Sequence, residues 1–378
     1  MRMTAAVMYE QGLPAPYVES KPFHIEEVEL DPPGPGEVLV EVRAAGLCHS
    51  DLSTVAGQRK RPLPIVGGHE GAGIVRELGA GVTGVAPGDH VVMVNVTGCG
   101  RCRSCRAGRP GLCQAVTASR IAGKIATGVR RLHLLNGDQL NHYSGLSVFA
   151  QYVVVVPESL IVIDKSVPLD VAAMLGCGIM TGAGAVFNSA HVRPNSSVAV
   201  IGLGGVGLSA VMAAREAGAA QIVGIDILPG KFDLARAVGA THCVDARDAD
   251  AVQQVLDLTD GGVDYAFEIS GNLTALSMAQ AITFRGGEVV NVGIGKSDAE
   301  FSVRQAPLIL EERVIRGTFM GGGVPSRDIP RLISLHQGGR FPIERLRSEH
   351  IGFAQLNESL DLLEKGAVVR QILMPHGV

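Results

Sequence analysis

The sequence predicts an α/β protein with two domains, one β-rich and one built on a doubly wound parallel sheet. Residues 1–45 alternate between apolar and polar side chains, with Pro and Gly at the breaks, which is typical of half-exposed strands. From about residue 179, short apolar runs alternate with helical segments, and this order predicts a parallel sheet covered on both faces. At 378 residues the chain is long enough to form two hydrophobic cores.

The composition is that of a globular protein and argues against several classes of partner. Charged residues make up 19% of the chain and hydrophobic residues 46%, which is not the balance of a disordered chain. The formal net charge of −4 argues against general attraction to nucleic acid or to acidic membranes, so we expect neither as a partner. The first residues lack the apolar core of a signal peptide, and no apolar run is long enough to span a bilayer. We therefore expect a cytoplasmic protein.

The first domain is predicted from its strands and turns. A Pro- and Gly-rich turn at residues 31–36 precedes an alternating strand at 37–43, and further turn-and-strand pieces are expected at 71–78 and 87–93. Short helices and loops join these strands.

Residues 198–226 organise the second domain. A β-branched run at 198–201 predicts a buried strand, an Ala-rich segment at 206–217 predicts a helix, and a second apolar run at 221–225 ends on Asp226. The pattern G-x-G-x-x-G follows the first strand and is formed by Gly202, Leu203, Gly204, Gly205, Val206 and Gly207.

Each part of this pattern suits the binding of a dinucleotide. Gly202 allows the tight turn, Gly204 lets the backbone approach a pyrophosphate, and Gly207 lets the helix and the strand pack closely. The free N–H groups of the helix face the phosphate, and Asp226 stands where a carboxylate accepts hydrogen bonds from an adenosine ribose. Because that carboxylate would repel a 2′-phosphate, we expect NAD rather than NADP. The alternative is an ordinary turn between a strand and a helix.

The segments that follow continue the alternation of helices and strands. The predicted elements are helices at 231–238, 249–259 and 273–284 and strands at 241–244, 263–268, 288–292 and 313–318. Beyond residue 323 the pattern is mixed, ending in a helix at 356–365 and a strand at 368–374.

Four of the seven cysteines lie close together in a Gly- and Arg-rich lobe. They are Cys99, Cys102, Cys105 and Cys113. Four thiolates can close a tetrahedron around zinc and leave no position for water, which makes such a site structural. An iron–sulfur cluster could also use four cysteines. The arginines of the lobe we interpret as solvated groups that balance thiolate charge rather than as a nucleic-acid site.

A second set of possible metal ligands is dispersed along the chain. Cys48, His69 and Cys177 together offer two thiolates and one imidazole, which leaves a fourth zinc position for water or substrate, and Glu70 follows His69 directly. Spacing alone does not unite residues so far apart. Taken singly, Cys177 is more often a buried apolar residue and His69 a structural turn histidine.

Several motifs, in this order and spacing, resemble the medium-chain zinc-dependent alcohol dehydrogenase family. They are residues 46–51 (GLCHSD), residues 68–73 (GHEGAG), the four-cysteine lobe, residues 175–178 (LGCG) and the glycine pattern. The long segment between Cys113 and Ser147 is similar to the liver-type and aryl-alcohol branch, and residues 176–184 look most like members that act on benzyl or allylic alcohols. The resemblance covers essentially the whole chain.

The resemblance implies the fold and the domain limits. A Rossmann doubly wound parallel sheet would bind NAD over residues 179–321. A β-rich, GroES-like catalytic domain would occupy residues 1–178, with its structural zinc lobe at 95–115, and resume at 322–378.

The resemblance also implies a role for each matching residue. Cys48, His69 and Cys177 would hold a catalytic zinc, with Glu70 able to approach the metal during ligand exchange. Asp51 would orient His69 through its second ring nitrogen, as an outer-shell partner does. Ser50 would take the proton from the bound alcohol.

Four further residues would contact the cofactor by the same resemblance. Thr181 would pack behind the nicotinamide ring, and Lys231 would assist Asp226 at the ribose. His49 and Arg370 would contact the pyrophosphate.

The function implied is NAD-linked, reversible oxidation of a primary alcohol to an aldehyde by hydride transfer from a zinc-bound alkoxide. Each subunit would hold two zinc ions, one catalytic and one structural. The partner would be a small-molecule alcohol or aldehyde, with an aromatic or allylic alcohol favoured. The alternatives are a thiol-adduct formaldehyde dehydrogenase, a secondary-alcohol or polyol dehydrogenase, and a catalytically silent NAD-binding redox sensor. The family likeness implies a homodimer, with a tetramer as the alternative.

Two positions depart from the family pattern. Ser53 stands where a histidine completes the proton path in liver-type enzymes, and a serine does not titrate near neutral pH. The loop before the histidine ligand reads Gly57-Gln58-Arg59-Lys60-Arg61, whereas glutathione-dependent formaldehyde dehydrogenases carry acidic residues there. This basic loop would not complement the cationic end of a glutathione adduct but could suit an anionic substrate. We favour the interpretation of a solvated basic loop over that of an anion site.

Overall fold

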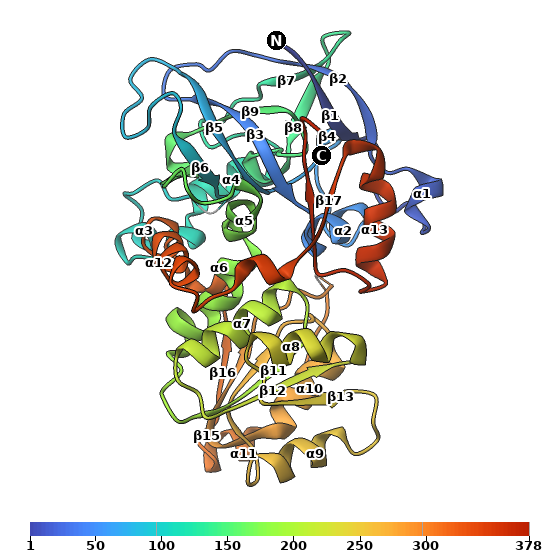
Figure 1. Cartoon of the computed structure of the whole chain (residues 1–378), viewed down its shortest axis with the longest axis vertical. Coiled ribbons are helices and arrows are strands. Elements are labelled where there is room, and N and C mark those ends of the chain that lie inside the picture. Colours follow the sequence, from blue (N-terminus) through green and yellow to red (C-terminus); the bar gives the residue numbers. More distant parts are fainter. Residues whose placement is uncertain (96, 297, 378) are drawn as a thin grey trace. The chain divides into compact units, whose positions relative to one another are not determined.

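The computed structural model describes residues 1–95, 97–296 and 298–377, and the chain divides into two compact units (Figure 1). The first unit holds Met1–Cys177, Val324–Ile333 and the segment from Arg347 onward, and the second holds Gly178–Gly323 and Ser334–Leu346.

The first unit is built on a closed barrel and an open sheet. The barrel has the strand order β1-β2-β7-β8-β4. The sheet has the order β10-β6-β5-β3-β18-β17, and β9 also pairs with β3. The strands are β1 (Arg2–Met8), β2 (His24–Leu30), β3 (Val38–Gly46), β4 (Ile65–Val66), β5 (Glu70–Leu78), β6 (His90–Met93), β7 (Leu132–Leu134), β8 (Gln139–His142), β9 (Tyr152–Val155), β10 (Leu160–Ile163), β17 (Arg347–Ile351) and β18 (Arg370–Leu373).

The helices of this unit are short, and most lie between strands. They are α1 (Tyr17–Ser20), α2 (His49–Val55), α3 (Arg103–Arg106), α4 (Gln114–Ile121), α5 (Leu169–Ala173) and α13 (Leu356–Glu364), with 3-10 turns at Pro110–Leu112, Tyr143–Gly145, Pro157–Ser159, Met174–Gly176 and Phe353–Gln355. Apolar side chains from both ends of the sequence form one core, in which Val40, Val42, Phe149 and Leu360 are fully buried.

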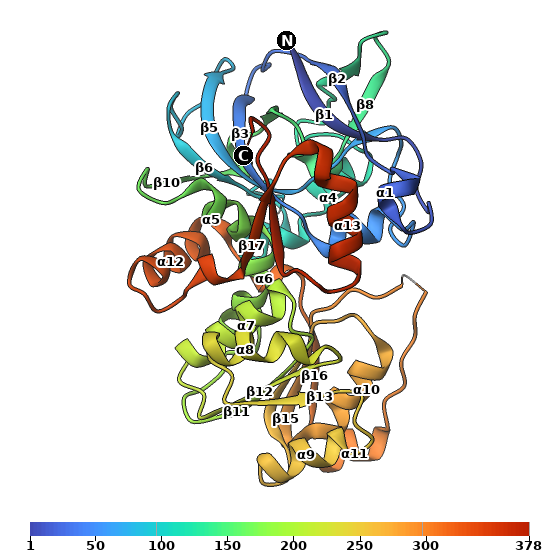
Figure 2. The same ribbon diagram turned by 45° about the vertical axis from the view of Figure 1, so that its right-hand side comes forward.

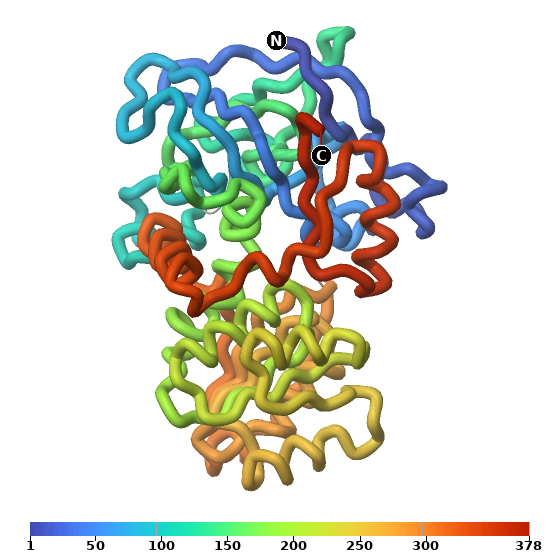
Figure 3. The backbone as a smooth tube through the Cα atoms, viewed as in Figure 1, coloured from blue at the N-terminus to red at the C-terminus, as the bar shows by residue number. Residues whose placement is uncertain are grey.

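The C-terminal strand completes the open sheet beside the N-terminal part of the chain. In β18, Leu373 pairs with Ala45 and Ile372 with Gly46, antiparallel to β3. Figure 3 shows this red C-terminal segment beside the blue β3 segment. The pairing brings Arg370, the first residue of β18, close to the loop that follows β3.

The second unit is a six-stranded parallel sheet in the order β13-β12-β11-β14-β15-β16 (Figure 2). The order runs outward from β11 in both directions, which is the doubly wound topology of a Rossmann domain. Helix α7 packs on β11 and β12, and α10 packs on β14 and β15. The predicted fold class is therefore confirmed. The strands are β11 (Ser197–Ile201), β12 (Gln221–Asp226), β13 (His242–Asp245), β14 (Val263–Glu268), β15 (Thr283–Asn291) and β16 (Val314–Gly317).

The helices of the second unit are α6 (Gly178–Gly184), α7 (Gly205–Glu216), α8 (Phe232–Val238), α9 (Ala251–Leu258), α10 (Leu273–Ile282) and α11 (Gln305–Leu310), with a π-helix at Ala185–Ala190 and 3-10 turns at Pro229–Lys231, Met320–Gly322 and Ile343–Leu346. Helices α7 to α10 fall close to their predicted positions, whereas α6, α11 and the π-helix were not predicted. Among the described residues no single helix is long and apolar enough to cross a membrane. One bent pair, Leu169–Gly176 and Gly178–Ala190, reaches that length and composition only when its two members are counted together.

The C-terminal third differs from the sequence expectation in two places. Helix α12 (Pro325–Gln337) was not predicted from the sequence. Pro330 lies inside this helix, and a proline there interrupts the helical pattern of the sequence. Residues Ser334–Leu346 group with the second unit, although we expected the whole of 322–378 in the catalytic domain. The guanidinium of Arg340 pairs with Glu216 of α7 and thereby ties this segment to that unit.

Candidate active site and metal centres

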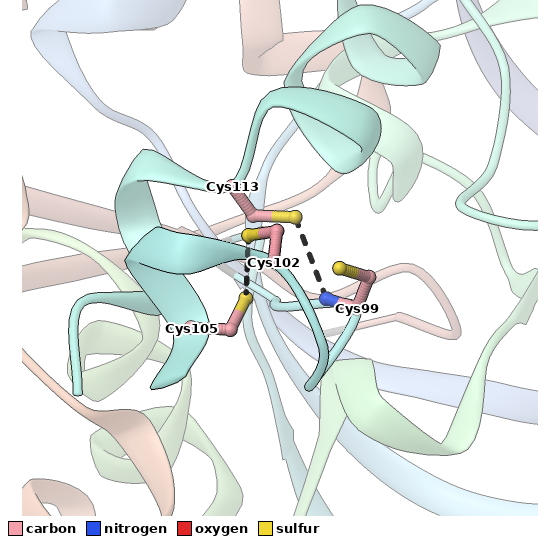
Figure 4. Close-up of side chains that lie close together, drawn as sticks. All are labelled: Cys99, Cys102, Cys105 and Cys113. Carbon is pink, nitrogen blue, oxygen red and sulfur yellow. Dashed lines mark hydrogen bonds between the residues drawn. The ribbon is translucent and has the colours of Figure 1, made fainter. Parts of the chain in front are cut away.

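The four lobe cysteines form one compact group of sulfur atoms (Figure 4). Their Sγ atoms all lie within 4.8 Å of one another, and those of Cys102 and Cys105 are 3.4 Å apart. In tetrahedral zinc coordination, Zn–S bonds of about 2.3 Å place sulfurs about 3.8 Å apart. The group therefore fits a four-coordinate zinc, and it leaves no ligand position for substrate.

Backbone N–H groups favour the thiolate form in this lobe. The N–H groups of Arg101 and Cys102 lower the pKa of Cys99 to about 6, and the N–H of Cys105 lowers that of Cys102. The N–H of Cys99 in turn donates to Sγ of Cys113 at 3.4 Å. Burial, followed by the hydrogen bond with Cys102, raises the pKa of Cys105 to about 12. A metal needs deprotonated thiols, so the backbone donors prepare Cys99 and Cys102 for binding.

The second group brings together four residues that lie far apart in the sequence. Cys48 caps α2, His69 directly precedes β5, Glu70 is its first residue, and Cys177 follows the turn Met174–Gly176. One ligand atom from each lies within 4.8 Å of the others, and all four residues are buried. Two thiols, an imidazole and a carboxylate fit zinc, and a site with three N/S ligands keeps a position for an exchangeable one.

Asp51 fixes the orientation of His69 and of the loop that carries Cys48. Its Oδ1 lies 3.0 Å from His69 Nδ1, and its Oδ2 accepts a hydrogen bond from the Cys48 N–H at 3.0 Å. Since the carboxylate holds a proton on Nδ1, the lone pair of Nε2 is left for a metal. Burial alone would lower the pKa of His69, but the charges of Asp51 and Cys177 and their hydrogen bonds with His69 together outweigh burial and raise it.

Glu70 forms a buried ion pair with Arg370. The Arg370 Nη1 lies 3.2 Å from both carboxylate oxygens of Glu70 and donates to the Leu47 carbonyl at 3.4 Å. Burial raises the pKa of Glu70 to about 8, although the Arg370 charge opposes this. In this structure Arg370 is thus engaged with Glu70, and its contact with a pyrophosphate stays a prediction.

The two thiols at this site influence each other. Hydrogen bonding with Cys177, followed by the charge of Arg370, lowers the pKa of Cys48. Hydrogen bonding with Cys48, followed by burial, raises that of Cys177. The pair therefore shares one proton, which a bound metal would displace.

Ser50 lies at the start of α2 with its hydroxyl engaged by an arginine. The Arg59 Nη1 donates to Ser50 Oγ at 3.2 Å, and the Ser50 carbonyl accepts from Tyr143 OH and Thr54 Oγ1, each at 3.0 Å. The Tyr143 ring packs edge-on against His69, with centroids 5.6 Å apart. The neighbouring His49 is exposed.

Sequence reasoning did not identify Arg59 or Tyr143 as neighbours of Ser50. The basic composition of residues 59–61 is the signal that could have indicated the arginine, but it did not specify a contact. Ser53, at the place of the relay histidine, is 5% exposed, and its carbonyl accepts from the backbone of Gln58 and Arg59.

The glycine pattern of the second unit has the geometry that a phosphate-binding turn requires. Gly202 has φ of +99°, which favours glycine, and a Cβ on Gly207 would lie 1.8 Å from the Gly202 carbonyl oxygen. A Cβ on Gly204 would meet nothing within 4 Å, so the backbone there is open to a ligand. Gly205 and Val206 begin α7 directly after this turn.

Asp226 is the buried acid at the end of β12. Its Oδ2 accepts from the Leu203 N–H at 2.7 Å and lies 3.1 Å from Lys231 Nζ. The glycine turn, the acid and the lysine are therefore held together. Thr181, in α6, donates to the sulfur of Met320 at 3.5 Å.

Comparison with known proteins places these sites in a family. Residues 34–165 match the family described as alcohol dehydrogenase GroES-like domain, and residues 205–337 match the one described as zinc-binding dehydrogenase. The chain is 39% identical over 377 residues to the S-(hydroxymethyl)glutathione dehydrogenase of Synechocystis sp., which covers 99% of this chain and 100% of the relative.

Two solved structures resemble the whole chain, each with 99% of both chains covered. The alcohol dehydrogenase zinc-binding domain protein from Burkholderia ambifaria has a TM-score of 0.93 at 39% identity. The benzyl alcohol dehydrogenase from Acinetobacter calcoaceticus has a TM-score of 0.92 at 33% identity. With similarity of this extent in sequence and in structure, the protein belongs to the medium-chain, zinc-dependent, NAD-linked alcohol dehydrogenase family, as its sequence predicts.

Proposed function

We propose that this protein catalyses the reversible, NAD-linked oxidation of a primary alcohol to an aldehyde, with an aromatic or allylic alcohol as substrate. A hydride would leave the carbinol carbon for C4 of the nicotinamide and the hydroxyl proton would leave for solvent, giving aldehyde, NADH and a proton. The buried set Cys48, His69 and Cys177 carries this proposal, because three N/S ligands leave a position for the alcohol. A structural or sensory role would not require that position.

Ser50 is proposed as the first acceptor of the alcohol proton. Zinc at this site would lower the pKa of a bound hydroxyl towards neutrality. A serine hydroxyl accepts one proton while it donates its own. Because Arg59 Nη1 already donates to Ser50 Oγ, the serine O–H stays free to turn toward another acceptor. Ser53 does not titrate near neutral pH, so the onward path would run through water.

Asp226 supports the preference for NAD. Its carboxylate is buried beside Lys231 and fixed by the Leu203 N–H, so it cannot turn away from a 2′-phosphate without breaking those bonds. We expect Asp226→Gly to raise kcat/KM with NADP and lower it with NAD, measured as initial rates with each cofactor. No gain with NADP would remove the argument for this role of Asp226.

Two relatives favour different substrates. The benzyl alcohol dehydrogenase supports an aromatic alcohol, and the S-(hydroxymethyl)glutathione dehydrogenase supports a thiol adduct of formaldehyde as the second candidate. The basic residues Arg59 and Arg61 favour the first, because they would repel the amino group of a glutathione adduct.

The test is the rate of NADH formation by zinc-loaded protein on a panel of substrates. The panel holds ethanol, benzyl alcohol, geraniol, a secondary alcohol and a thiol–formaldehyde adduct. We expect the highest kcat/KM on benzyl alcohol or geraniol. Activity on the thiol adduct alone would replace the proposed substrate class. Inactivity on the whole panel, with two zinc ions and tight NAD binding, would favour the sensor alternative.

A further inference from the structure

Three arginines lie beside the catalytic metal group without a carboxylate partner. They are Arg59 and Arg61, from the loop after α2, and Arg120, near the end of α4, and we call them the arginine cluster. None of the three forms an ion pair within the part of the chain that the structure describes. Arg59 donates to Ser50, Arg61 to the Lys60 carbonyl, and Arg120 to the Asn95 carbonyl and Thr117.

Gln11 holds the backbone of the basic loop in place. Its amide nitrogen donates to the carbonyls of Thr54 at 2.7 Å and Arg59 at 2.9 Å, and its amide oxygen accepts from the Arg61 N–H at 3.0 Å. Gln11 thus bonds the loop at Arg59 and Arg61 and ties it to Thr54 of α2. The guanidinium groups are therefore presented from an ordered segment.

Two of these guanidinium groups keep a buried donor unpaired. The Nε atoms of Arg61 and Arg120 are both inaccessible to solvent and have no hydrogen-bond partner. A buried unpaired donor of a charged group costs free energy, so these arginines are held beside the site at a cost to stability. Burial lowers the pKa of Arg120, and the positive charge of Arg61 lowers it further.

The cluster lies one aromatic ring away from the metal ligand His69. The Arg61 guanidinium sits over the Tyr143 ring, 5.9 Å from its centroid, and that ring contacts His69. Arg59 contacts Ser50, the proposed proton acceptor. A substrate whose hydroxyl reached Ser50 could thus present its far end to the arginine cluster.

We propose that the arginine cluster is a subsite for an oxyanion on the substrate, and that the preferred alcohol carries a carboxylate at the end opposite its hydroxyl. The inference rests on the proposed function and specifies its substrate class. Guanidinium groups bind carboxylates through paired, charge-assisted hydrogen bonds, and no carboxylate of the described chain is paired with the three arginines of the cluster. The carboxylate belongs to a small aromatic alcohol or to a thiol adduct, two sources with the same chemistry.

The test compares matched charged and neutral substrates. The pairs are 4-(hydroxymethyl)benzoate against 4-methylbenzyl alcohol, and S-(hydroxymethyl)glutathione against the adduct of formaldehyde with its dimethyl ester. We expect the wild type to prefer 4-(hydroxymethyl)benzoate over its neutral partner at least tenfold in kcat/KM, through a lower KM. Arg61→Gln and Arg120→Gln should each reduce that preference at least tenfold. A preference confined to the glutathione pair would assign the subsite to the thiol adduct's carboxylate.

Lys60→Gln is the matched control. Lys60 is exposed, carries the same charge and lies between the two loop arginines, so it should leave the preference unchanged. If Lys60→Gln and Arg61→Gln lost the preference for the charged substrate equally, the preference would reflect general attraction between a basic loop and an anion. That result would overturn the subsite. Oxidation of 4-methylbenzyl alcohol with no preference for either charged substrate would also overturn it, while the proposed function stood. Inactivity on all four substrates and on geraniol would instead refute the proposed function.

A binding measurement separates the subsite from catalysis. A ligand that binds the folded state stabilises it. We therefore expect 4-methylbenzoate to raise the unfolding temperature of the zinc-loaded wild type and of Lys60→Gln, and to raise that of Arg61→Gln by a smaller amount. If Arg61→Gln does not fold, Arg61→Lys keeps the charge but loses the planar fork, and it should weaken the shift. An equal shift in all folded variants would show that the anion binds elsewhere.

Discussion

The two metal-binding groups of this chain differ in the range of sequence that forms them and in the groups that surround them. The lobe draws its ligands from one short stretch, Cys99 to Cys113, and backbone N–H groups stabilise its thiolates. The catalytic group draws on residues as distant as Cys48 and Cys177, is fully buried, and contacts Asp51 and the ion pair with Arg370. A local group needs only its own turn, whereas a dispersed group needs the whole unit. We therefore expect loss of the lobe's metal to lower the stability of the protein and loss of the catalytic group's metal to lower the rate of the reaction.

The largest effect should follow loss of a catalytic ligand. We expect Cys48→Ser to lower kcat/KM on the best alcohol by roughly 10³-fold or more, because metal polarisation contributes several kcal/mol to the transition state. Metal analysis should find one zinc per chain, and unfolding should stay cooperative. Cys243→Ser, which removes a thiol outside both groups, is the control and should keep activity and both zincs. If Cys48→Ser unfolded and its folded fraction kept the wild-type kcat/KM, the catalytic group would act on stability as the lobe does, and the contrast between the two metal groups would be wrong.

The lobe should show the opposite behaviour. We expect Cys105→Ser to lose one zinc and about 4 kcal/mol of stability, a size typical of losing a metal, and to lower the unfolding temperature by roughly 10 °C. Activity per folded molecule at low temperature should change little, because no sulfur of this lobe belongs to the catalytic group. A large fall in kcat with an unchanged unfolding temperature would contradict a structural lobe.

Lowering the pH would protonate the thiolates of both metal groups, so their acid sensitivity can be compared only while the protein stays folded. His142 affects the stability of the fold in acid. Burial lowers the pKa of His142 to about 3, while its unfolded value is about 6.5. Between these values the unfolded chain binds a proton that the folded chain does not, so stability is full above about pH 6.5 and falls as the pH decreases. At pH 5 the loss should be about 2 kcal/mol.

The variant His142→Gln should remove this acid sensitivity. A glutamine can still accept from the Arg131 N–H, which donates to His142 Nε2 at 3.0 Å, but it does not titrate. Denaturant unfolding at pH 7 and pH 5 measures the difference. An identical fall in the wild type and the variant would assign the acid sensitivity to the metal groups instead.

The smallest effect should come from Asp51→Asn. The amide oxygen can still accept from His69 Nδ1, but the amide nitrogen would then face the Cys48 N–H, donor against donor. We expect about tenfold weaker zinc binding at the catalytic group, within the range for outer-shell partners, and no change at the lobe. Competition with a chelator measures both. Equal weakening at the two groups would contradict a local role.

The sequence predicted those parts of the molecule in which the signal is local. The glycine pattern, with Asp226 at the end of the next strand, specified a turn whose positive φ at Gly202 and close packing at Gly207 the structure shows. The four-cysteine lobe was predictable for the same reason, since its spacing lies within one short stretch.

Long-range contacts were predictable only through family resemblance or not at all. The Glu70–Arg370 pair joins strands from opposite ends of the sequence, and no periodicity records it. The contact of Arg59 with Ser50 depends on the path of a loop that Gln11 holds, which the composition of that loop does not show. Helix α12 was missed because Pro330 is a local breaker that tertiary packing tolerates.

The pairing of β18 with β3 also sets an order of events during synthesis. Domains form as the chain leaves the ribosome, from the N-terminus onward. The lobe has all its sulfurs once Cys113 has emerged, so it can take a metal early. The catalytic group must wait for Cys177 and then for β18, which pairs beside Gly46 and brings Arg370 to Glu70. A nascent chain would thus acquire its two metals at different times, the structural one long before the catalytic one.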